Sequence, residues 1–418
     1  RLTDCRLTDC RLTDCRLTYG GRHMVMGDWR ELKRLGDERI ARVRALDGFY
    51  VLWPRYCSNW TQHLHEVAQG ATYRADPRFL GFCEVGEKPS LANAMTPVPP
   101  SQDGAISMME YLRQRSRNPN IGLMCLPGTH GEWALWQGVQ GSFDYLAHMA
   151  ASGAVHTYVP VAEEREHYIA EIDSYLALMA EMDLLSQQTL AARIHAYLAL
   201  DRGPLLRYMI SSEYQYFNGA SPHCSFVPRE REIYVDVGAS QGEQVGRMAG
   251  LVGPDSQLWA LEPNRLDFAS LRSLSWLLPI RAERAVAGAE HGGSVDFYTD
   301  PSYPHGSRFV LPSDSAQWRE ARKDWIEALP AVSLDHLVPD QATMIKADVE
   351  GGELGILQGA TRHLAQPQCR LSIAAYHYPN DLLTLSRFMR SLGRQRQSVR
   401  GHHAGVWDMV LYVHEEAA

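Results

Sequence analysis

The chain has 418 residues, of which 45% are apolar and 22% charged, an ordinary composition for a globular protein with more than one hydrophobic core. Its formal net charge of −8 leaves no excess of Lys and Arg to neutralise phosphates, so nucleic-acid and anionic-membrane partners are disfavoured. The sequence has no run of about 18 apolar residues and no basic-then-apolar leader, which predicts a cytoplasmic protein without a membrane span.

The eight cysteines predict neither a disulfide framework nor a structural zinc site. Three of them belong to a repeat at the N-terminus, and the other five are scattered singly without a CxxC pair. That repeat, RLTDC, occurs three times in tandem and continues as RLTYGGRHM. We interpret residues 1–23 as an artificial leader ahead of a natural start near Met24 or Met26, and we leave them out of the fold prediction.

Residues 24–160 are predicted to form a small Rossmann-like α/β domain. Short apolar runs (FYVLWP, RFLGFCE, IGLMCLP and VHTYVPV) alternate with segments of helical spacing such as DWRELKRLGDERIARVRALDG. Such alternation is typical of a parallel sheet. The first strand leads into PRYCSNW instead of a glycine-rich turn, so we expect this domain to bind no dinucleotide.

Residues 161–225 are predicted to be a helical bridging region, because Ile169, Ile172, Leu176 and Met179 recur at helical spacing. Residues 226–418 are then predicted to form a complete doubly wound domain. Its expected strands are EIYVDVGAS, QLWALEPN, IRAERAVAG, TMIKADVEGGE and RLSIAAYHYP, separated by helical segments and followed by a closing strand.

In an open α/β sheet, ligands bind beyond the carboxyl ends of the strands. The residues that end the strands are therefore expected to lie along one rim of the sheet. They are Gly238, Glu262, Val286, Asp348 and His377. Gly238 and Gly242 would let the backbone approach a ligand closely. Glu262 lies 20 residues after Gly242, where an acid binds the hydroxyls of a ribose.

The glycine spacing is not that of a dinucleotide-binding dehydrogenase. The GxGxxG pattern needs glycine at Ser240 and near Glu243, where this chain has GASQGEQ. Asp236 places a carboxylate near the loop, which repels phosphate and suits the ammonium or sulfonium group of S-adenosylmethionine. The turn therefore indicates a methyl donor.

Several motifs in order, VDVGASQG, LEPN, AVAG, IKADVEGGELGILQGA and AAYHYPNDL, resemble the FkbM family of S-adenosylmethionine-dependent methyltransferases. The resemblance covers about residues 214–418. KADVEGGE and LQGA followed by YHYP are its most specific part, whereas DVGAxxG marks only the wider methyltransferase class. The resemblance implies a class I methyltransferase fold for the C-terminal domain.

The resemblance also implies a set of cofactor-binding residues. They are Asp236, Gly238, Ala239, Ser240, Gly242, Glu262, Pro263, Val286 and Asp348. Those of the glycine turn surround the methionine part, with Ser240 where many members have Asn. Glu262 is expected to bind the ribose hydroxyls, and Val286 to line the adenine.

Asp348, Glu350 and His377 are the candidates for chemistry. Asp348 and Glu350 stand two residues apart, so both should face one side, and His377 follows the next strand. Methyl transfer to oxygen requires removal of the hydroxyl proton, and we predict His377 as the general base. The same cluster could hold Mg²⁺, which we rank below direct acid–base catalysis. The structural alternative is that Asp348 caps the following helix, with Glu350 and Glu353 complementing its dipole.

Other candidates are weaker. Trp133 is a possible substrate contact, and residues 302–310 form an insertion that could close over the acceptor. The histidines at 63–65 and 401–403 lack partner ligands at metal-binding spacing, and we assign them no role.

The sequence thus predicts a methyltransferase acting on a hydroxylated small molecule. By resemblance, the acceptor is a sugar, a glycolipid precursor or a secondary metabolite. The N-terminal domain is expected to shape the acceptor pocket or to mediate assembly into a homo-oligomer. Two alternatives stay open: an NAD-dependent oxidoreductase, disfavoured by the missing third glycine, and a non-catalytic binding or scaffold protein that retains the fold.

Overall fold

The structure is a computed structural model in two units, unit 1 (Arg1–Met209 and His403–Trp407) and unit 2 (Ile210–His402 and Asp408–Ala418). Each unit is described by itself. The structure describes residues 16–19, 22–25, 29–54, 56–57, 71–85, 96–97, 105–126, 138–155, 159–210, 215–217, 226–301, 306–310, 314–402, 406 and 408–416.

Two short strands fall largely within the segment expected to be a leader. β1 (Arg16–Tyr19) pairs antiparallel with β2 (Arg22–Val25). The structure thus has a hairpin in a segment for which we made no fold prediction, and residues 1–15 lie outside the described part of the chain.

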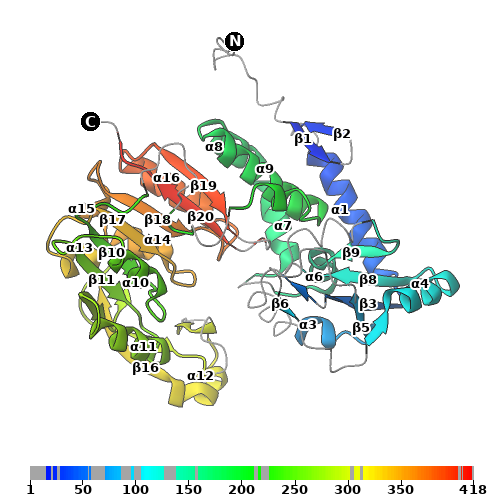
Figure 1. The fold of residues 1–418 in the computed structure, drawn as a ribbon, viewed down its shortest axis with the longest axis horizontal. Coiled ribbons are helices and arrows are strands. Elements are labelled where there is room, and N and C mark those ends of the chain that lie inside the picture. The colour runs from blue at the N-terminus through cyan, green and yellow to red at the C-terminus, as the bar shows by residue number, and fades with distance from the viewer. Residues whose placement is uncertain are drawn as a thin grey trace, which may run out of the picture. The chain divides into compact units, whose positions relative to one another are not determined.

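Unit 1 is built on a five-stranded parallel sheet of order β7-β5-β3-β8-β9 (Figure 1). Its strands are β3 (Gly48–Pro54), β5 (Phe79–Val85), β7 (Ala105–Ser107), β8 (Ile121–Cys125) and β9 (Ser142–Asp144). The chain starts in the centre with β3, moves outward and then crosses to β8, as in a doubly wound sheet. A separate antiparallel pair joins β4 (Tyr56–Cys57) and β6 (Thr96–Pro97).

Helices surround this sheet and follow its strands. They are α1 (Trp29–Arg44), α3 (Ala71–Arg74), α4 (Met108–Arg117), α6 (Tyr145–Ser152), α7 (Val161–Ala170), α8 (Ile172–Ala180), α9 (Leu184–Ala199) and the 3₁₀ turn η4 (Leu205–Arg207). The expected bridging region contributes α7, α8 and α9 to unit 1. The predicted strand VHTYVPV is absent from the described residues of that stretch: Val155 and Pro160 form an isolated bridge, and α7 begins at Val161.

Unit 2 contains a seven-stranded sheet of order β12-β11-β10-β17-β18-β20-β19. Its strands are β10 (Ile233–Val237), β11 (Gln257–Leu261), β12 (Ile280–Glu283), β17 (Met344–Ala347), β18 (Arg370–Ala374), β19 (Gln397–Gly401) and β20 (Met409–Val413). The first five in this order are parallel, and β20 is antiparallel to both of its neighbours. This is the doubly wound α/β fold that the sequence predicts.

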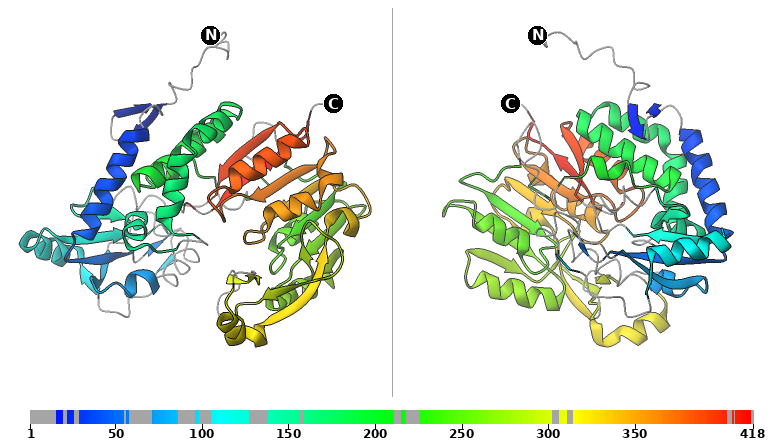
Figure 2. Two further views of the ribbon diagram at one scale, coloured as in Figure 1. Left: turned by 180° about the vertical axis from the view of Figure 1, so that it is seen from behind. Right: turned by 45° about the vertical axis from the view of Figure 1, so that its right-hand side comes forward.

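Helices connect these strands, and Figure 2 shows the unit from behind. They are α10 (Glu243–Ala249), α11 (Arg265–Ser275), α12 (Ala316–Arg322), η7 (Lys323–Trp325), α13 (Leu334–Leu337), α14 (Glu353–Gln358), α15 (Thr361–Leu364) and α16 (Asp381–Ser391). The core between sheet and helices includes Tyr216, Tyr234, Met344 and Tyr412, all at most 3% exposed. None of the described helices of either unit is long and apolar enough to cross a membrane.

A second, four-stranded sheet of order β13-β16-β14-β15 is inserted after β12. It comprises β13 (Val286–Ala287), β14 (Ser294–Tyr298), β15 (Arg308–Phe309) and β16 (Ile326–Val332). The expected single strand IRAERAVAG is therefore two strands in two different sheets. Val286 does not end a strand of the main sheet, because β12 stops at Glu283 and β13 pairs with β16.

Candidate functional site

A cavity of about 890 Å³ lies in unit 2 at the carboxyl ends of β10, β11 and β17. The chain leaves β10 toward β11 on one side and returns in β17 on the other, so the cavity sits at the switch point where doubly wound sheets bind ligands. All but two of the predicted cofactor-binding and catalytic residues line it. The lining members of that set are Gly238, Ala239, Ser240, Gly242, Glu262, Pro263, Val286, Asp348 and Glu350.

The turn after β10 needs its two glycines for a reason that differs from our expectation. Gly238 and Gly242 have φ angles of 72° and 93°, in the left-handed region that favours glycine. A Cβ on Gly238 would lie 1.8 Å from the carbonyl oxygen of Asp348, and one on Gly242 would lie 2.8 Å from a methyl carbon of Leu274. The close approach that these glycines permit is thus to the protein's own chain.

Glu262 follows β11 and is fixed by the backbone. Its two carboxylate oxygens accept hydrogen bonds from the N–H groups of Ser240 and Asn264, each at 2.7 Å. Burial raises the pKa of Glu262 to about 7, although these two amides act to lower it. Ser240 reaches Glu262 from a left-handed conformation with φ 47°. The glycine turn and Glu262 therefore form one rigid wall of the cavity.

Asp236 does not lie in this wall, contrary to the prediction. It is fully buried, does not line the cavity, and its Oδ1 is 3.0 Å from Nζ of Lys346. Lys346 also donates to the carbonyl of Gly238 at 2.5 Å. Burial by itself lowers the pKa of Lys346, but Asp236 and Asp348 raise it above its usual range, so Lys346 stays an ammonium.

Lys346 is a cavity residue that the sequence analysis quoted within a motif without giving it a role. One signal in the sequence points to it, and the structure adds a second observation. It stands two residues before Asp348, so the two alternate onto one face of the β17 segment. It also lies beside Asp236 in the parallel register of β10 and β17.

Asp348 follows β17 and is held by side chains. Its Oδ2 accepts a hydrogen bond of 2.7 Å from the hydroxyl of Tyr216, and its Oδ1 lies 3.6 Å from Nε2 of His377. It does not cap the next helix: α14 begins at Glu353, and its N-cap residue is Gly352. The capping alternative is therefore wrong, and Asp348 faces the cavity with a carboxylate oriented from both sides.

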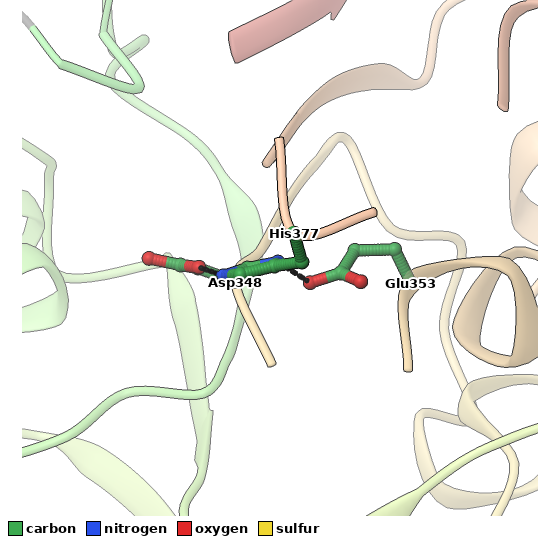
Figure 3. Close-up of side chains that lie close together, drawn as sticks. All are labelled: Asp348, Glu353 and His377. Carbon is green, nitrogen blue, oxygen red and sulfur yellow. Dashed lines mark ion pairs between the residues drawn. The ribbon is translucent and has the colours of Figure 1, made fainter. Parts of the chain in front are cut away.

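His377 lies between carboxylates, as Figure 3 shows for Asp348 and Glu353. Its Nδ1 is 2.8 Å from Oε1 of Glu353, and its Nε2 is 3.4 Å from Oε2 of Glu350. Burial by itself lowers the pKa of His377, but Glu353 first, then Glu350 and Asp348, raise it to about 10. The side chain is 1% exposed and does not line the cavity.

This placement does not allow His377 to act as the general base that we predicted. An imidazolium has no lone pair with which to accept a proton, so at neutral pH His377 acts as a buried cation that orders the surrounding acids. Glu353, which the sequence analysis considered only as a dipole complement, is its nearest partner and is also 1% exposed. Its Oε1 additionally accepts from the backbone N–H of Val349 at 3.1 Å.

The acids and His377 were also considered as a metal site. Ligand atoms of Asp348, Glu353 and His377 lie within 4.8 Å of one another. However, Glu353 faces Nδ1 while Asp348 and Glu350 face Nε2. One ion binds only one nitrogen of an imidazole, so an ion at Nδ1 would lie next to Glu353 and an ion at Nε2 next to Asp348 and Glu350.

The inserted sheet forms the far wall of the cavity through Phe297, Ser307 and Phe309. Ser307 accepts a hydrogen bond of 3.1 Å from the Asn264 side chain, which ties the insertion to the Glu262 loop. A Cβ on Gly352 would lie 2.8 Å from the Phe309 ring. Residues 302–305 of this insertion, Trp133 and the histidines at 63–65 lie outside the described residues, as does His403.

One segment of the chain matches a known family model. Residues 236–396 match the family model of the methyltransferase FkbM domain. No curated protein shows a significant match to the sequence.

Three solved structures are similar to this chain. A methyltransferase FkbM from Methylobacillus flagellatus KT is similar with a TM-score of 0.64 and 19% identity, over 93% of this chain and 99% of that one. An rRNA methylase from Streptococcus thermophilus matches 46% of this chain and 92% of its own, with a TM-score of 0.28 and 13% identity. Aeropyrum pernix fibrillarin with natively bound S-adenosyl-L-methionine matches 45% of this chain and 68% of its own, with a TM-score of 0.27 and 11% identity. The fold of the first of these structures is shared by this chain.

Proposed function

Residues 236–396 carry an FkbM methyltransferase domain, and on that premise we propose that the protein is an S-adenosylmethionine-dependent O-methyltransferase acting on a hydroxylated small molecule. The observation that carries the proposal is the cavity at the switch point, where a glycine turn and a fixed carboxylate, Glu262, face two further acids, Asp348 and Glu350. The acceptor expected from the sequence is a hydroxyl of a sugar, a glycolipid precursor or a secondary metabolite.

The residues of the cavity fit the parts of the methyl donor. Glu262 is held by two amides with both oxygens ordered, which suits a bidentate hydrogen bond to the two hydroxyls of a ribose. Val286 and Phe297 are buried apolar residues of the inserted sheet and suit the adenine. When bound, S-adenosylmethionine would supply an electrophilic methyl group on a sulfonium. The turn of Gly238 and Ala239 would take its methionine part.

Proton removal from the acceptor falls to the acids of the β17 end. The oxygens of Asp348 are oriented by Tyr216 and His377, whereas the Glu350 side chain is 31% exposed and lines the cavity. We therefore assign Glu350 as the proton acceptor, with Asp348 beside it. Catalysis would then depend mainly on positioning the acceptor oxygen in line with the methyl group.

The test is calorimetric titration of the full chain with S-adenosylmethionine, S-adenosylhomocysteine and NAD. We expect micromolar binding of both adenosyl ligands, a loss of about 100-fold or more in Glu262→Ala because two hydroxyl contacts disappear, and no change in the exposed control Glu290→Ala. Preference for NAD would instead support the oxidoreductase alternative. Binding of the donor without methyl transfer to any of a panel of hydroxylated acceptors would support the scaffold alternative.

Two expectations from the sequence are not part of this proposal. It stays a prediction that residues 24–160 either help to bind the acceptor or mediate assembly into a homo-oligomer. A requirement for Mg²⁺ is not part of the proposal, because the three carboxylates already surround a protonated His377, and an imidazolium has no lone pair to offer a metal. An acceptor screen run with and without Mg²⁺ tests this.

A further inference from the structure

Tyr216 is a cavity residue outside the segment that matches the family model. It belongs to the described segment 215–217, and both Gln215 and Tyr216 line the cavity. The side chain is 3% exposed, and the backbone has a φ angle of 68°. A positive φ angle is rare for residues other than glycine, and especially for bulky ones. Such conformations persist only where their surroundings fix them, and they gather at functional sites.

Three contacts fix Tyr216. Its backbone N–H donates to the hydroxyl of Tyr412 on β20 at 2.9 Å, and its own hydroxyl donates to Oδ2 of Asp348 at 2.7 Å. The ammonium of Lys346 lies 5.2 Å from the centre of its ring. The preceding Gln215 is held by Asp408 through a hydrogen bond of 2.5 Å. The ring and its hydroxyl are therefore held firmly.

The hydrogen bond from the Tyr216 hydroxyl to Asp348 affects the cavity, because Asp348 lines it. Hydrogen bonds to a carboxylate are short and strongly directional, so the Tyr216 hydroxyl selects one orientation of the Asp348 side chain. Asp348 also stands directly beside the glycine turn, since its carbonyl oxygen occupies the space that a Cβ on Gly238 would need. An oriented carboxylate at this point faces the place assigned above to the methionine part of the donor.

We propose that Tyr216 is a positioning residue of the methyl-donor site, which acts by orienting the Asp348 carboxylate toward the methionine part of S-adenosylmethionine. The inference rests on the proposed function. Tyr216 itself is not assigned a contact with the reacting atoms, so its whole effect on the donor should pass through Asp348.

The experiment is a double-mutant cycle read by calorimetric titration with S-adenosylhomocysteine, using the full chain, Tyr216→Phe, Asp348→Asn and the double variant. Tyr234→Phe is the matched control: Tyr234 belongs to the same core cluster, does not line the cavity, and its buried hydroxyl has no hydrogen-bond partner among the described residues. Thermal unfolding of each variant is recorded. If Tyr216→Phe does not fold, Tyr412→Phe is used in its place. That variant removes the acceptor of the Tyr216 N–H and keeps the Tyr216 hydroxyl.

We expect Tyr216→Phe to weaken binding about tenfold, because one hydrogen bond to a charged group is lost, and Tyr234→Phe to stay within about twofold. The double variant should bind as weakly as Asp348→Asn alone, a non-additivity that a merely structural role would not produce. Tyr412→Phe should weaken binding by a smaller factor.

Three results would overturn the inference. Tyr216→Phe could bind like the wild type, or its effect could multiply with that of Asp348→Asn, which would show that it acts independently. If Tyr412→Phe is the variant used, binding equal to the wild type has the same meaning. By contrast, a wild-type chain that binds neither S-adenosylhomocysteine nor S-adenosylmethionine would overturn the proposed function and this inference with it.

Discussion

The cavity has two carboxylate centres that are held in different ways. Glu262, after β11, is fixed by the backbone amides of Ser240 and Asn264. Asp348, after β17, is fixed by the side chains of Tyr216 and His377. The first centre depends on the path of a short loop, whereas the second depends on residues that are distant in the sequence. The two should therefore respond differently to substitution and to pH.

The largest effect is expected where the two centres meet. In Gly238→Ala, the new Cβ would lie 1.8 Å from the backbone of Asp348, and φ would stay in the left-handed region. We expect a loss of about 4 kcal/mol or more in the free energy of unfolding, measured by urea denaturation. Gly288→Ala is the control, since nothing lies within 4 Å of its Cβ position. Equal stability of the two variants would refute the contact.

The next largest effect is expected at the second centre, around Asp348, which is held by side chains. In His377→Ala, Glu353 would lose its charged partner while remaining 1% exposed, with Asp348 and Glu350 close by. Leaving a buried charge unpaired predicts a loss of about 3 kcal/mol in the free energy of unfolding at pH 7. The exposed His291→Ala should change it by less than about 0.5 kcal/mol. A small loss in His377→Ala would mean that solvent already reaches these acids.

The same residue predicts a pH window. The pKa of His377 is raised from 6.5 to about 10, so its contribution to stability is complete below pH 6.5 and is lost as the pH rises toward 10. Urea denaturation across this range should show a decline in the wild type that is absent in His377→Ala. A decline of the same size in both proteins would assign the titration to other groups.

The backbone-held centre should titrate in a lower window. The pKa of Glu262 is raised from 4.5 to about 7, so the folded protein gains stability from its protonation below pH 4.5 and loses it as the pH rises to 7. We expect this loss to be about 3 kcal/mol in the free energy of unfolding. Glu262→Gln, which stays neutral, should not show it. Unchanged pH dependence in this variant would contradict the burial of the carboxyl.

The smallest expected effect concerns the loop that holds Glu262. The Asn264 side chain accepts from the backbone N–H of Leu266 at the start of α11 and donates to Ser307. Asn264→Ala should cost about 1 kcal/mol of unfolding free energy, as is usual for a lost helix cap. It should also weaken binding of S-adenosylhomocysteine slightly. Asn264→Asp, which keeps the cap, should restore most of the stability.

The sequence predicted the backbone-held centre well. The glycines of the turn and Glu262 follow apolar runs, and a run followed by a turn marks the end of a strand without any knowledge of tertiary contacts. The C-terminal doubly wound sheet was confirmed for the same reason, and the FkbM family model matches residues 236–396, within the segment whose motifs resemble that family. Asp236 was misplaced because a position near a strand end does not say which face a side chain takes.

The side-chain-held centre was predicted only in part. Asp348, Glu350 and His377 were correctly expected near one another, but their charges were assigned without Glu353, whose proximity raises the pKa of His377. Tyr216 was missed because it precedes Asp348 by 132 positions and no local pattern joins them. Val286 was placed in the wrong sheet, since a break of two residues between β12 and β13 leaves no hydrophobic signal.

Because of the break between β12 and β13, the walls of the cavity come from two separately hydrogen-bonded sheets. The seven-stranded sheet supplies the turn and the acids, and the four-stranded sheet supplies Phe297 and Phe309. A change of curvature in the smaller sheet would alter the width of the cavity without breaking a ladder of the larger one. The seven-stranded sheet is therefore the constant wall of the cavity and the four-stranded sheet the variable one. Substitutions in the inserted strands can change the shape of the ligand that fits while leaving the main sheet intact.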